Sequence, residues 1–293
     1  MIPEVAQLIH DYEQHGYVVE EALATVLLLA LRLEKPILLE GPPGVGKTEA
    51  AHIISAHQEA ELIRLQCYEG LDVNTAIYEW NYQKQLLSIK INENSKQSAA
   101  DTEAQIFGED FLLKRPLLRA ITAPNKPPVL LIDEIDRADE EFEAFLLELL
   151  SDFQITIPEL GTIKAGHRPI VVLTSNRTRE LSDALKRRCL YHWIDYPSYQ
   201  KELNIVRKKF PNMNEAISAQ LVTFVHQLRE LNLRKSPGIA ETLDWANAML
   251  ALNTTEFSAE YIDQTLGCVL KSDSDLKQVR SEGIEKLLQE QSG

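Results

Sequence analysis

The stretch Leu38-Leu39-Glu40-Gly41-Pro42-Pro43-Gly44-Val45-Gly46-Lys47-Thr48 decides the fold of this chain. The apolar residues before its first glycine indicate a buried strand over residues 36–40, and residues 49–56 are predicted to form a helix. Between them, residues 41–48 match G-x-x-x-x-G-K-[ST], the phosphate-binding loop. The alternative is a Gly/Pro turn in which Gly-Lys-Thr occurs by chance. Such a turn would not require a strand before it and a helix after it. The stretch therefore predicts that the chain binds a nucleoside triphosphate.

The residue types of this loop suit the chemistry of a triphosphate. Its glycines allow the backbone to bring N–H groups close to phosphate oxygens, and the N-terminus of the following helix adds a positive dipole end. Lys47 is expected to reach the β- and γ-phosphates, and the Thr48 hydroxyl is an expected Mg²⁺ ligand. The predicted cofactor-binding residues of the loop are Gly41, Pro42, Pro43, Gly44, Val45, Gly46, Lys47 and Thr48.

Composition and charge favour a cytoplasmic protein whose partner is another protein. No apolar run approaches the roughly 20 residues that a membrane span needs, and the N-terminus lacks the pattern of an export signal. The formal net charge of -14 repels nucleic acid and anionic membranes on average. Cys67, Cys189 and Cys268 are in no metal-ligand spacing, and we expect reduced thiols.

Strand and helix patterns alternate up to Pro197, and only helical patterns follow it. This alternation predicts a parallel sheet covered on both faces by helices, in an α/β domain over residues 1–197, followed by a small helical domain over residues 198–293. Residues 92–102 are expected to form an exposed, mobile loop. The predicted strands are 36–40, 61–66, 129–133, 170–174 and 191–194, with a hairpin over 155–168; the predicted helices are 1–33 with a break near 14–19, 49–56, 75–87, 111–121, 140–153, 181–188, 214–231, 240–252, 259–270 and 275–289.

Two carboxylates, Asp133 and Glu134, close the fully apolar run that begins at Val129. Ligands bind at the carboxyl ends of the strands in such sheets, so we expect Asp133 to position Mg²⁺ together with Thr48. Side chains alternate at a strand end, which directs Glu134 elsewhere. There it could act on a water that attacks the γ-phosphate. The alternative is that both are helix N-terminal charges or solvated loop residues.

Asn176 and two arginines complete the set of candidate catalytic residues. Asn176 ends another predicted strand at the same sheet edge, either as a sensor that holds the attacking water or as a helix cap. Arg187 and Arg188 end a short helix, where cations are favourable against the dipole. Alternatively one of them is an arginine finger that enters the γ-phosphate site of a neighbouring subunit, a role that suits arginine better than lysine.

These motifs together resemble those of the AAA+ ATPases and, within them, the MoxR group. Residues 41–48 look like Walker A, Leu131-Ile132-Asp133-Glu134-Ile135-Asp136 like Walker B, Leu173-Thr174-Ser175-Asn176 like sensor 1, and Leu185-Lys186-Arg187-Arg188-Cys189 like the finger motif. The resemblance spans nearly the whole chain. It implies a P-loop NTPase sheet with an insertion in helix 2 between Gly70 and Pro116, a hairpin before sensor 1 and a helical lid. It also implies ATP and Mg²⁺ as cofactors, and a hexameric ring in which Arg188 acts across the subunit boundary.

A finer likeness is to the CoxD-type branch of that group, carried by residues 65–72, 78–87 and 236–245. This resemblance implies a role in maturing the metal centre of carbon monoxide dehydrogenase, with a separate partner that carries a von Willebrand factor A domain. The sequence departs from the group where Gly238-Ile239 replaces the sensor 2 arginine. Either Arg234 or Lys235 substitutes for it, or the lid senses nucleotide weakly. Tyr17 and Val18 are candidates for packing against the base, and the choice of ATP over GTP rests on the resemblance.

Three functional hypotheses follow from these residues. The first is an ATP-driven remodelling chaperone in a ring, which the complete motif set and the two insertions favour. The second is a nucleotide-gated scaffold with little turnover, which the missing sensor 2 arginine favours. The third is a DNA-associated AAA+ motor, against which the acidic composition argues.

Overall fold

The computed structural model describes residues 2–92, 106–254 and 256–289. Beyond residue 92, the exposed loop predicted over residues 92–102 lies outside the described residues. The chain packs as two compact units. The first holds residues 1–21, 41–47 and 193–293, and the second holds residues 22–40 and 48–192. The domain division predicted at residue 197 stays a prediction. Among the described residues, no helix combines the length and the apolar character that a membrane span requires.

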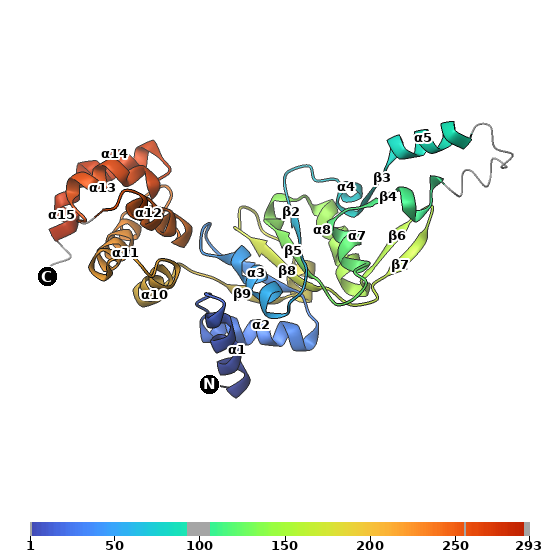
Figure 1. Ribbon diagram of the computed structural model, residues 1–293, viewed down its shortest axis with the longest axis horizontal. Coiled ribbons are helices and arrows are strands. Elements are labelled where there is room, and N and C mark those ends of the chain that lie inside the picture. Colours follow the sequence, from blue (N-terminus) through green and yellow to red (C-terminus); the bar gives the residue numbers. More distant parts are fainter. Residues whose placement is uncertain (1, 93–105, 255, 290–293) are drawn as a thin grey trace. The chain divides into compact units, whose positions relative to one another are not determined.

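A five-stranded sheet with strand order β2-β5-β8-β1-β9 forms the framework of the second unit (Figure 1). Strand β5 pairs in parallel with β2 on one side and with β8 on the other, and β8 pairs in parallel with β1. The predicted P-loop NTPase sheet is therefore confirmed. The five strands are β1 (Ile37–Glu40), β2 (Leu62–Gln66), β5 (Val129–Asp133), β8 (Ile170–Ser175) and β9 (Leu190–Trp193).

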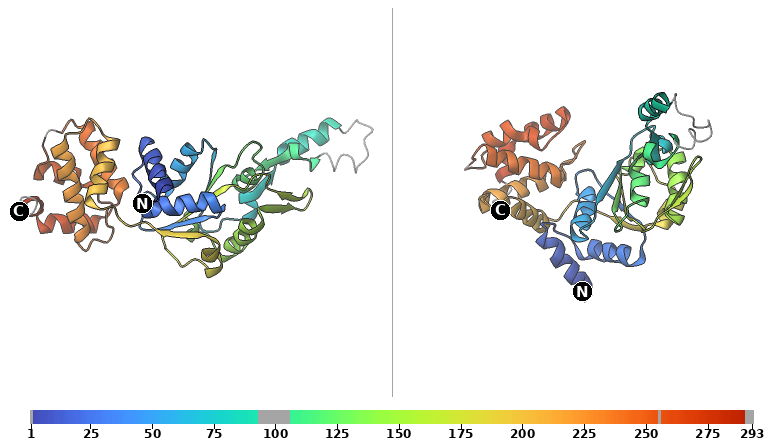
Figure 2. Two further views of the ribbon diagram at one scale, coloured as in Figure 1. Left: turned by 90° about the horizontal axis from the view of Figure 1, so that it is seen from below. Right: turned by 45° about the vertical axis from the view of Figure 1, so that its right-hand side comes forward.

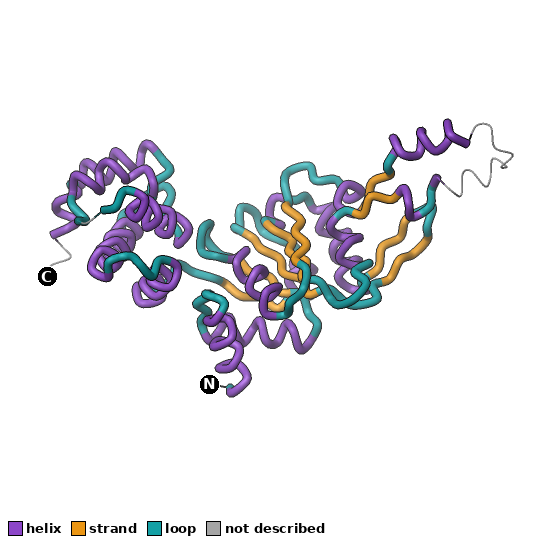
Figure 3. Tube along the Cα trace, viewed as in Figure 1, coloured by secondary structure: helices purple, strands orange, loops and turns teal. Residues whose placement is uncertain are grey.

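Helices flank this sheet, as the uninterrupted apolar strands require (Figure 3). All five residues of β5 are buried, so both of its faces are covered. Helix α8 (Glu140–Asp152) is capped at its N-terminus by Asp139, whose carboxylate accepts a 2.8 Å hydrogen bond from the Phe142 amide. Phe153, in the left-handed conformation, follows its last residue. The other helices of this region are α2 (Glu21–Leu33), α3 (Lys47–His57), α7 (Pro116–Ile121) and α9 (Asp183–Arg188), with the short turn η2 (Ile135–Arg137).

The segment between β2 and β5 differs from the prediction. The helix predicted over 75–87 is wrong in its middle, because β3 (Tyr78–Trp80) interrupts it between α4 (Val73–Ile77) and α5 (Tyr82–Asn92). The helix predicted over 111–121 is likewise wrong in its first part, where η1 (Glu109–Phe111) ends and β4 (Leu112–Lys114) follows, and α7 begins only at Pro116. Strands β3 and β4 pair antiparallel, and Trp80 is buried there against Phe107. The missed signal is the period-two alternation of Tyr78-Glu79-Trp80.

Figures 1 and 2 show α5 projecting from this two-stranded sheet, away from the central strands. The hairpin predicted over 155–168 is confirmed with shorter strands, β6 (Gln154–Ile157) and β7 (Gly161–Lys164). Ile155 and Ile157 are buried in the same apolar cluster as β5, so one face of the hairpin belongs to the core.

The first unit contains α1 (Pro3–Gln14) and the C-terminal helices. Helix α10 (Tyr199–Lys209) was not predicted, because among its eleven residues only Leu203, Val206 and Glu202 are buried. The helix predicted over 275–289 is broken at Gly283, whose φ of 89° ends the first part. The helix predicted over 259–270 ends at Thr265 in a tighter turn. The helices after α10 are α11 (Glu215–Glu230), α12 (Ile239–Ala251), α13 (Ala259–Thr265), η3 (Leu266–Cys268), α14 (Asp273–Glu282) and α15 (Ile284–Gln289).

A buried ionic cluster lies inside this helical region. The Glu202 carboxylate is fully buried and accepts hydrogen bonds from both terminal nitrogens of Arg229 (2.6 and 2.9 Å) and from the Thr242 hydroxyl (2.6 Å). His226 Nε2 lies 2.9 Å from the same carboxylate. Burial raises the pKa of Glu202, but the bonds from His226 and Arg229 outweigh burial and leave this pKa below its usual value. The cluster therefore favours the ionised form of Glu202 in the folded protein.

We predict that Glu202→Gln destabilises the protein more at pH 7 than at pH 4. The substitution leaves the Arg229 guanidinium buried without its counter-ion, a loss of about 3 kcal/mol in the free energy of unfolding. Because the folded-state pKa of Glu202 is lowered from 4.5, its contribution is complete well above pH 4.5, begins to decline as the pH falls past that value, and is lost as the pH falls through the lowered folded-state pKa. Urea unfolding followed by circular dichroism at both pH values measures the difference, with Glu260→Gln on the exposed face of α13 as the control. An equal loss at both pH values would contradict a lowered pKa.

Candidate functional site

The phosphate-binding loop is folded around its own lysine. Helix α3 begins at Lys47, and the buried Nζ of this residue donates to the carbonyl oxygens of Gly41 (2.7 Å) and Pro42 (2.6 Å). Gly46 has a φ of 90°, a conformation that side chains disfavour. At Gly41 a Cβ atom would lie 2.0 Å from the Ile194 carbonyl oxygen. The backbone conformation of the loop thus explains its glycines. The Lys47 ammonium group is held by carbonyl oxygens of the loop itself.

The start of α12 packs directly on this loop within the first unit. The Ala240 amide donates to the Gly44 carbonyl oxygen at 3.1 Å, and a Cβ atom at Gly238 would lie 2.8 Å from that oxygen. Arg234 and Lys235, the two candidates for replacing the sensor 2 arginine, are exposed, and their backbone amides donate to Asp275. At Gly238, a side chain would therefore meet the backbone of the loop.

The two predicted metal residues contact one another in the second unit. Thr48 Oγ1 donates to Asp133 Oδ1 at 3.2 Å, and Thr174 Oγ1 donates to the same oxygen at 2.5 Å. Hydroxyl and carboxylate oxygens are the ligands that Mg²⁺ prefers, and it usually takes only one or two of them from protein, with phosphate oxygens completing the set. The described residues contain no cluster of three or more His, Cys, Asp or Glu that could hold a metal without such help. Thr48 and Asp133 thus fit Mg²⁺ bound with a nucleotide.

Glu134 stands beside Asp133 with its carboxylate turned to different partners. Its backbone is left-handed, with φ 55° and ψ 50°, a conformation that clusters at functional sites in residues other than glycine. Asn176 Nδ2 donates to Glu134 Oε1 at 3.3 Å, while Gln66 Nε2 and Arg137 Nη1 each lie 3.1 Å from Oε2. The structure therefore joins Glu134 to Asn176, both of which the sequence placed at this edge.

Four residues at this edge were missed by the sequence analysis. Arg64 and Gln66 lie on β2, where the residue pairing sets Gln66 opposite Asp133. Arg64 donates through Nε (3.0 Å) and Nη2 (2.5 Å) to Asp133 Oδ2. The available signal was the period-two pattern over residues 61–66, which sets two polar side chains on one face of a strand. Thr174 and Arg137 complete the set.

Asp136 holds the loop that follows β8. Its buried carboxylate accepts hydrogen bonds from the Thr178 amide (2.8 Å), the Thr178 hydroxyl (2.7 Å) and the Asn176 amide (3.2 Å). Its three bonds fix the backbone from which Asn176 reaches Glu134.

The remaining candidates lie apart from these contacts. Arg187 and Arg188 are exposed at the end of α9, and Arg188 Nε donates to Ser151 Oγ at 2.9 Å. No hydrogen bond or ion pair found among the described residues joins either arginine to Asp133 or Glu134. Tyr17 and Val18 are half-buried in the connecting segment that follows α1 in the sequence, and their role in base packing stays a prediction.

Comparison with known proteins places the chain in a family. Uncharacterized proteins of Staphylococcus haemolyticus and Staphylococcus aureus (strain bovine RF122 / ET3-1) are each 27% identical to it, over 75% of this chain and 78% and 77% of theirs. A mutant form of RuvB from Thermotoga maritima superposes with a TM-score of 0.51 at 19% identity, covering 89% of this chain and 72% of that one, a likeness of fold alone. Residues 37–194 match the ATPase family associated with various cellular activities (AAA). Since that match spans more than half of the sequence, the chain belongs to the AAA ATPase family.

Proposed function

We propose that this chain is a Mg²⁺-dependent ATPase of the MoxR type that works as a cytoplasmic, ring-forming remodelling chaperone. Residues 198–293 would form its lid. The observation that carries the proposal is the connected set of hydrogen bonds at one sheet edge, from Thr48 through Asp133 and Thr174 to Glu134 and Asn176. These are the residue types that phosphoryl transfer needs: a metal carboxylate, a hydroxyl ligand, a base and a polar group that holds water.

Each residue has a defined task in this proposal. Lys47 exchanges its loop carbonyl partners for phosphate oxygens, and Thr48 and Asp133 hold Mg²⁺, which when bound neutralises charge on the phosphates. Glu134 accepts the proton of the attacking water, which Asn176 orients. Arg188 of a neighbouring subunit stabilises negative charge on the γ-phosphate.

The client and partner are proposed from the CoxD-type resemblance. A separate protein with a von Willebrand factor A domain would act together with the ring to mature or activate a client metalloenzyme. Helix α5, in the proposed helix 2 insertion, supports a protein contact, since it exposes 64% of Tyr82, 60% of Leu86 and 70% of Ile91. Exposed apolar residues grouped on one element mark interaction surfaces.

A nucleotide-gated scaffold with slow turnover is the second candidate. It is favoured by the three donors on the Glu134 carboxylate, Gln66, Arg137 and Asn176, which compete with any water for its oxygens. Steady-state ATPase measurements with and without the partner distinguish the two candidates. A DNA-associated motor is disfavoured by the net charge of -14, and the RuvB likeness is one of fold alone.

We predict that Glu134→Gln abolishes ATP hydrolysis and leaves nucleotide binding intact. The substitution keeps the side-chain size but removes the proton acceptor, which in general acid–base catalysis is worth about a hundred- to ten-thousand-fold in rate. Phosphate release at saturating ATP and binding of a fluorescent ATP analogue measure the two quantities. Glu140→Gln, an exposed position at the start of α8, is the control. Wild-type turnover in Glu134→Gln would refute the assigned base.

A second prediction concerns the arginine finger. Arg188→Ala is expected to reduce hydrolysis on the order of a thousandfold without unfolding the subunit, because its side chain is exposed. Arg187→Ala, the adjacent exposed arginine, is the matched control and should retain activity within a few-fold. Mixing Arg188→Ala with Glu134→Gln subunits tests action in trans. Because each variant lacks a different half of the composite site, mixed assemblies should regain part of the activity, and no recovery would argue against a shared site.

A further inference from the structure

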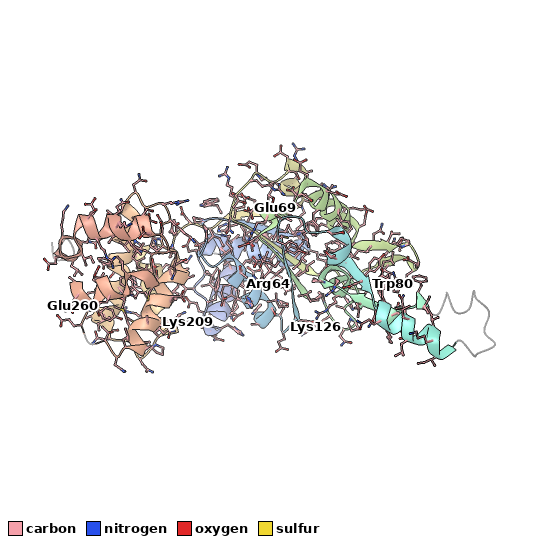
Figure 4. The ribbon with its side chains drawn as sticks, turned by 90° about the horizontal axis from the view of Figure 1, so that it is seen from above. Arg64, Glu69, Trp80, Lys126, Lys209 and Glu260 are labelled. Atoms are coloured by element: carbon pink, nitrogen blue, oxygen red, sulfur yellow. The ribbon has the colours of Figure 1, made fainter. Side chains whose placement is uncertain are left out.

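Arg64 links the two carboxylates of the candidate site. Its guanidinium donates through Nε and Nη2 to Asp133 Oδ2, and Nη2 also lies 2.5 Å from Gln66 Oε1. Gln66 Nε2 in turn donates to Glu134 Oε2 at 3.1 Å. One unbroken chain of polar contacts thus runs from the metal carboxylate to the proposed base. Arg64, labelled in Figure 4, lies on β2.

The burial of the two partners of the ion pair is unequal. The side chain of Asp133 is 5% exposed, whereas that of Arg64 is 52% exposed. A buried carboxylate requires a compensating charge, and Asp133 forms an ion pair with Arg64. Arg64 can exchange this contact for water at little cost, because half of its surface already faces solvent. Asp133 cannot do so unless another cation replaces the guanidinium.

The link through Gln66 has a defined direction. A guanidinium has only donors, and an ionised carboxylate has only acceptors. Arg64 therefore selects the Oε1 end of the Gln66 amide, which leaves the NH₂ end for Glu134. As long as Arg64 keeps its contact with Asp133, the amide is held in the orientation that occupies one oxygen of Glu134.

We propose that Arg64 is a positioning residue that neutralises Asp133 when no divalent cation is bound. By orienting the Gln66 amide, it also keeps one oxygen of the Glu134 carboxylate in a hydrogen bond. The inference rests on the proposed Mg²⁺-dependent nucleotide site. Like charges repel across a shared carboxylate, so Arg64 and a divalent cation compete for Asp133. When the cation binds, Arg64 loses its hydrogen bonds to Asp133 Oδ2 and no longer fixes the orientation of the Gln66 amide. Metal binding and the freeing of Glu134 become one coupled event.

The coupling predicts that removal of the Arg64 charge strengthens metal binding. If the Arg64 guanidinium binds Asp133 more tightly without Mg²⁺ than with it, thermodynamic linkage requires that Arg64 lowers the affinity for Mg²⁺ by the same factor. We expect Arg64→Met to lower the Mg²⁺ concentration that half-saturates binding of fluorescent ADP, by roughly five-fold or more. The same variant should melt at a lower temperature than the wild type in EDTA, with the difference shrinking when Mg²⁺ and ADP are added.

Two control variants distinguish the effect of the Arg64 charge from a general effect on the structure. Arg119→Met removes a guanidinium of similar exposure (51%) whose partner, Glu61, is also exposed, and it should leave the Mg²⁺ dependence unchanged. Arg64→Lys keeps the charge, so its Mg²⁺ half-saturation should stay within about two-fold of the wild type. If Arg64→Met does not fold, Arg64→Gln replaces it with the same expected direction.

A double-mutant cycle tests the link to Glu134. The effects of Arg64→Met and Glu134→Gln on the melting temperature in EDTA should be non-additive in the wild-type background. They should become additive when Gln66 is replaced by Met, because the connecting amide is gone. Additivity in both backgrounds would overturn the coupling through Gln66.

The results distinguish this inference from the proposed function. If the wild type binds fluorescent ADP in a Mg²⁺-dependent way and Arg64→Met shows unchanged or weaker Mg²⁺ dependence, the competition is overturned and the ATPase proposal stands. If the wild type shows no Mg²⁺-dependent binding of ADP or ATP analogues, the proposed function itself fails. Equal tightening by Arg64→Lys and Arg64→Met would also overturn the inference, because charge would then not be the cause.

Discussion

The parallel pairing of β5 with a strand on each side is the constraint on which the rest of the structure depends. The pairing with β2 sets Gln66 opposite Asp133, and the pairing with β8 sets Leu173 opposite Ile132, so that Thr174 follows beside Asp133. A shift of one residue in either pairing would turn these side chains to the other face of the sheet. The buried apolar residues of β5 and β8 prevent such a shift, so the hydrophobic core fixes the geometry of the polar edge.

Much of this edge could be predicted from sequence because its residues end apolar runs. Asp133 ends a strand rich in Val, Ile and Leu, Asn176 follows another, and the loop at residues 41–48 has a pattern of its own. Arg64 and Gln66 could not be placed, since nothing local in the sequence says that β2 neighbours β5. The same limit explains β3 and β4, whose three-residue strands are stabilised by pairing with each other and by burial of Trp80. Helix α10 was missed for another reason: one of its few buried side chains is the charged Glu202, which only the Arg229 contact makes compatible with burial.

The start of α12 contacts the phosphate-binding loop at a position where packing leaves no room for a side chain. At Gly238 the backbone approaches the loop so closely that a Cβ atom would lie 2.8 Å from Pro43 and Gly44 backbone atoms. The Gly238 amide is itself bonded to the Glu241 carboxylate at 2.9 Å, and the Arg229 side chain donates to the neighbouring Pro237 carbonyl at 2.8 Å. The start of α12 thus contacts the loop through backbone atoms. Arg229, which is bound to the buried Glu202, stabilises this segment through its hydrogen bond to Pro237. An arginine side chain reaching from this position would require that contact to open.

Asp133 and Glu134 are adjacent and both carry a carboxylate, but the environments of the two carboxylates differ. Asp133 is the last residue of β5, and its carboxylate stays buried among two hydroxyls and a guanidinium. The left-handed conformation of Glu134 turns the next carboxylate out of the strand direction, where its side chain is 32% exposed and its partners are two amides and Arg137. A buried carboxylate with fixed donors suits a group that must hold a charge in place, whereas a partly exposed one can exchange its donors for water. Because the Thr174 hydroxyl accepts from the Glu134 amide and donates to Asp133, the two environments are set by the same short contact and cannot move independently.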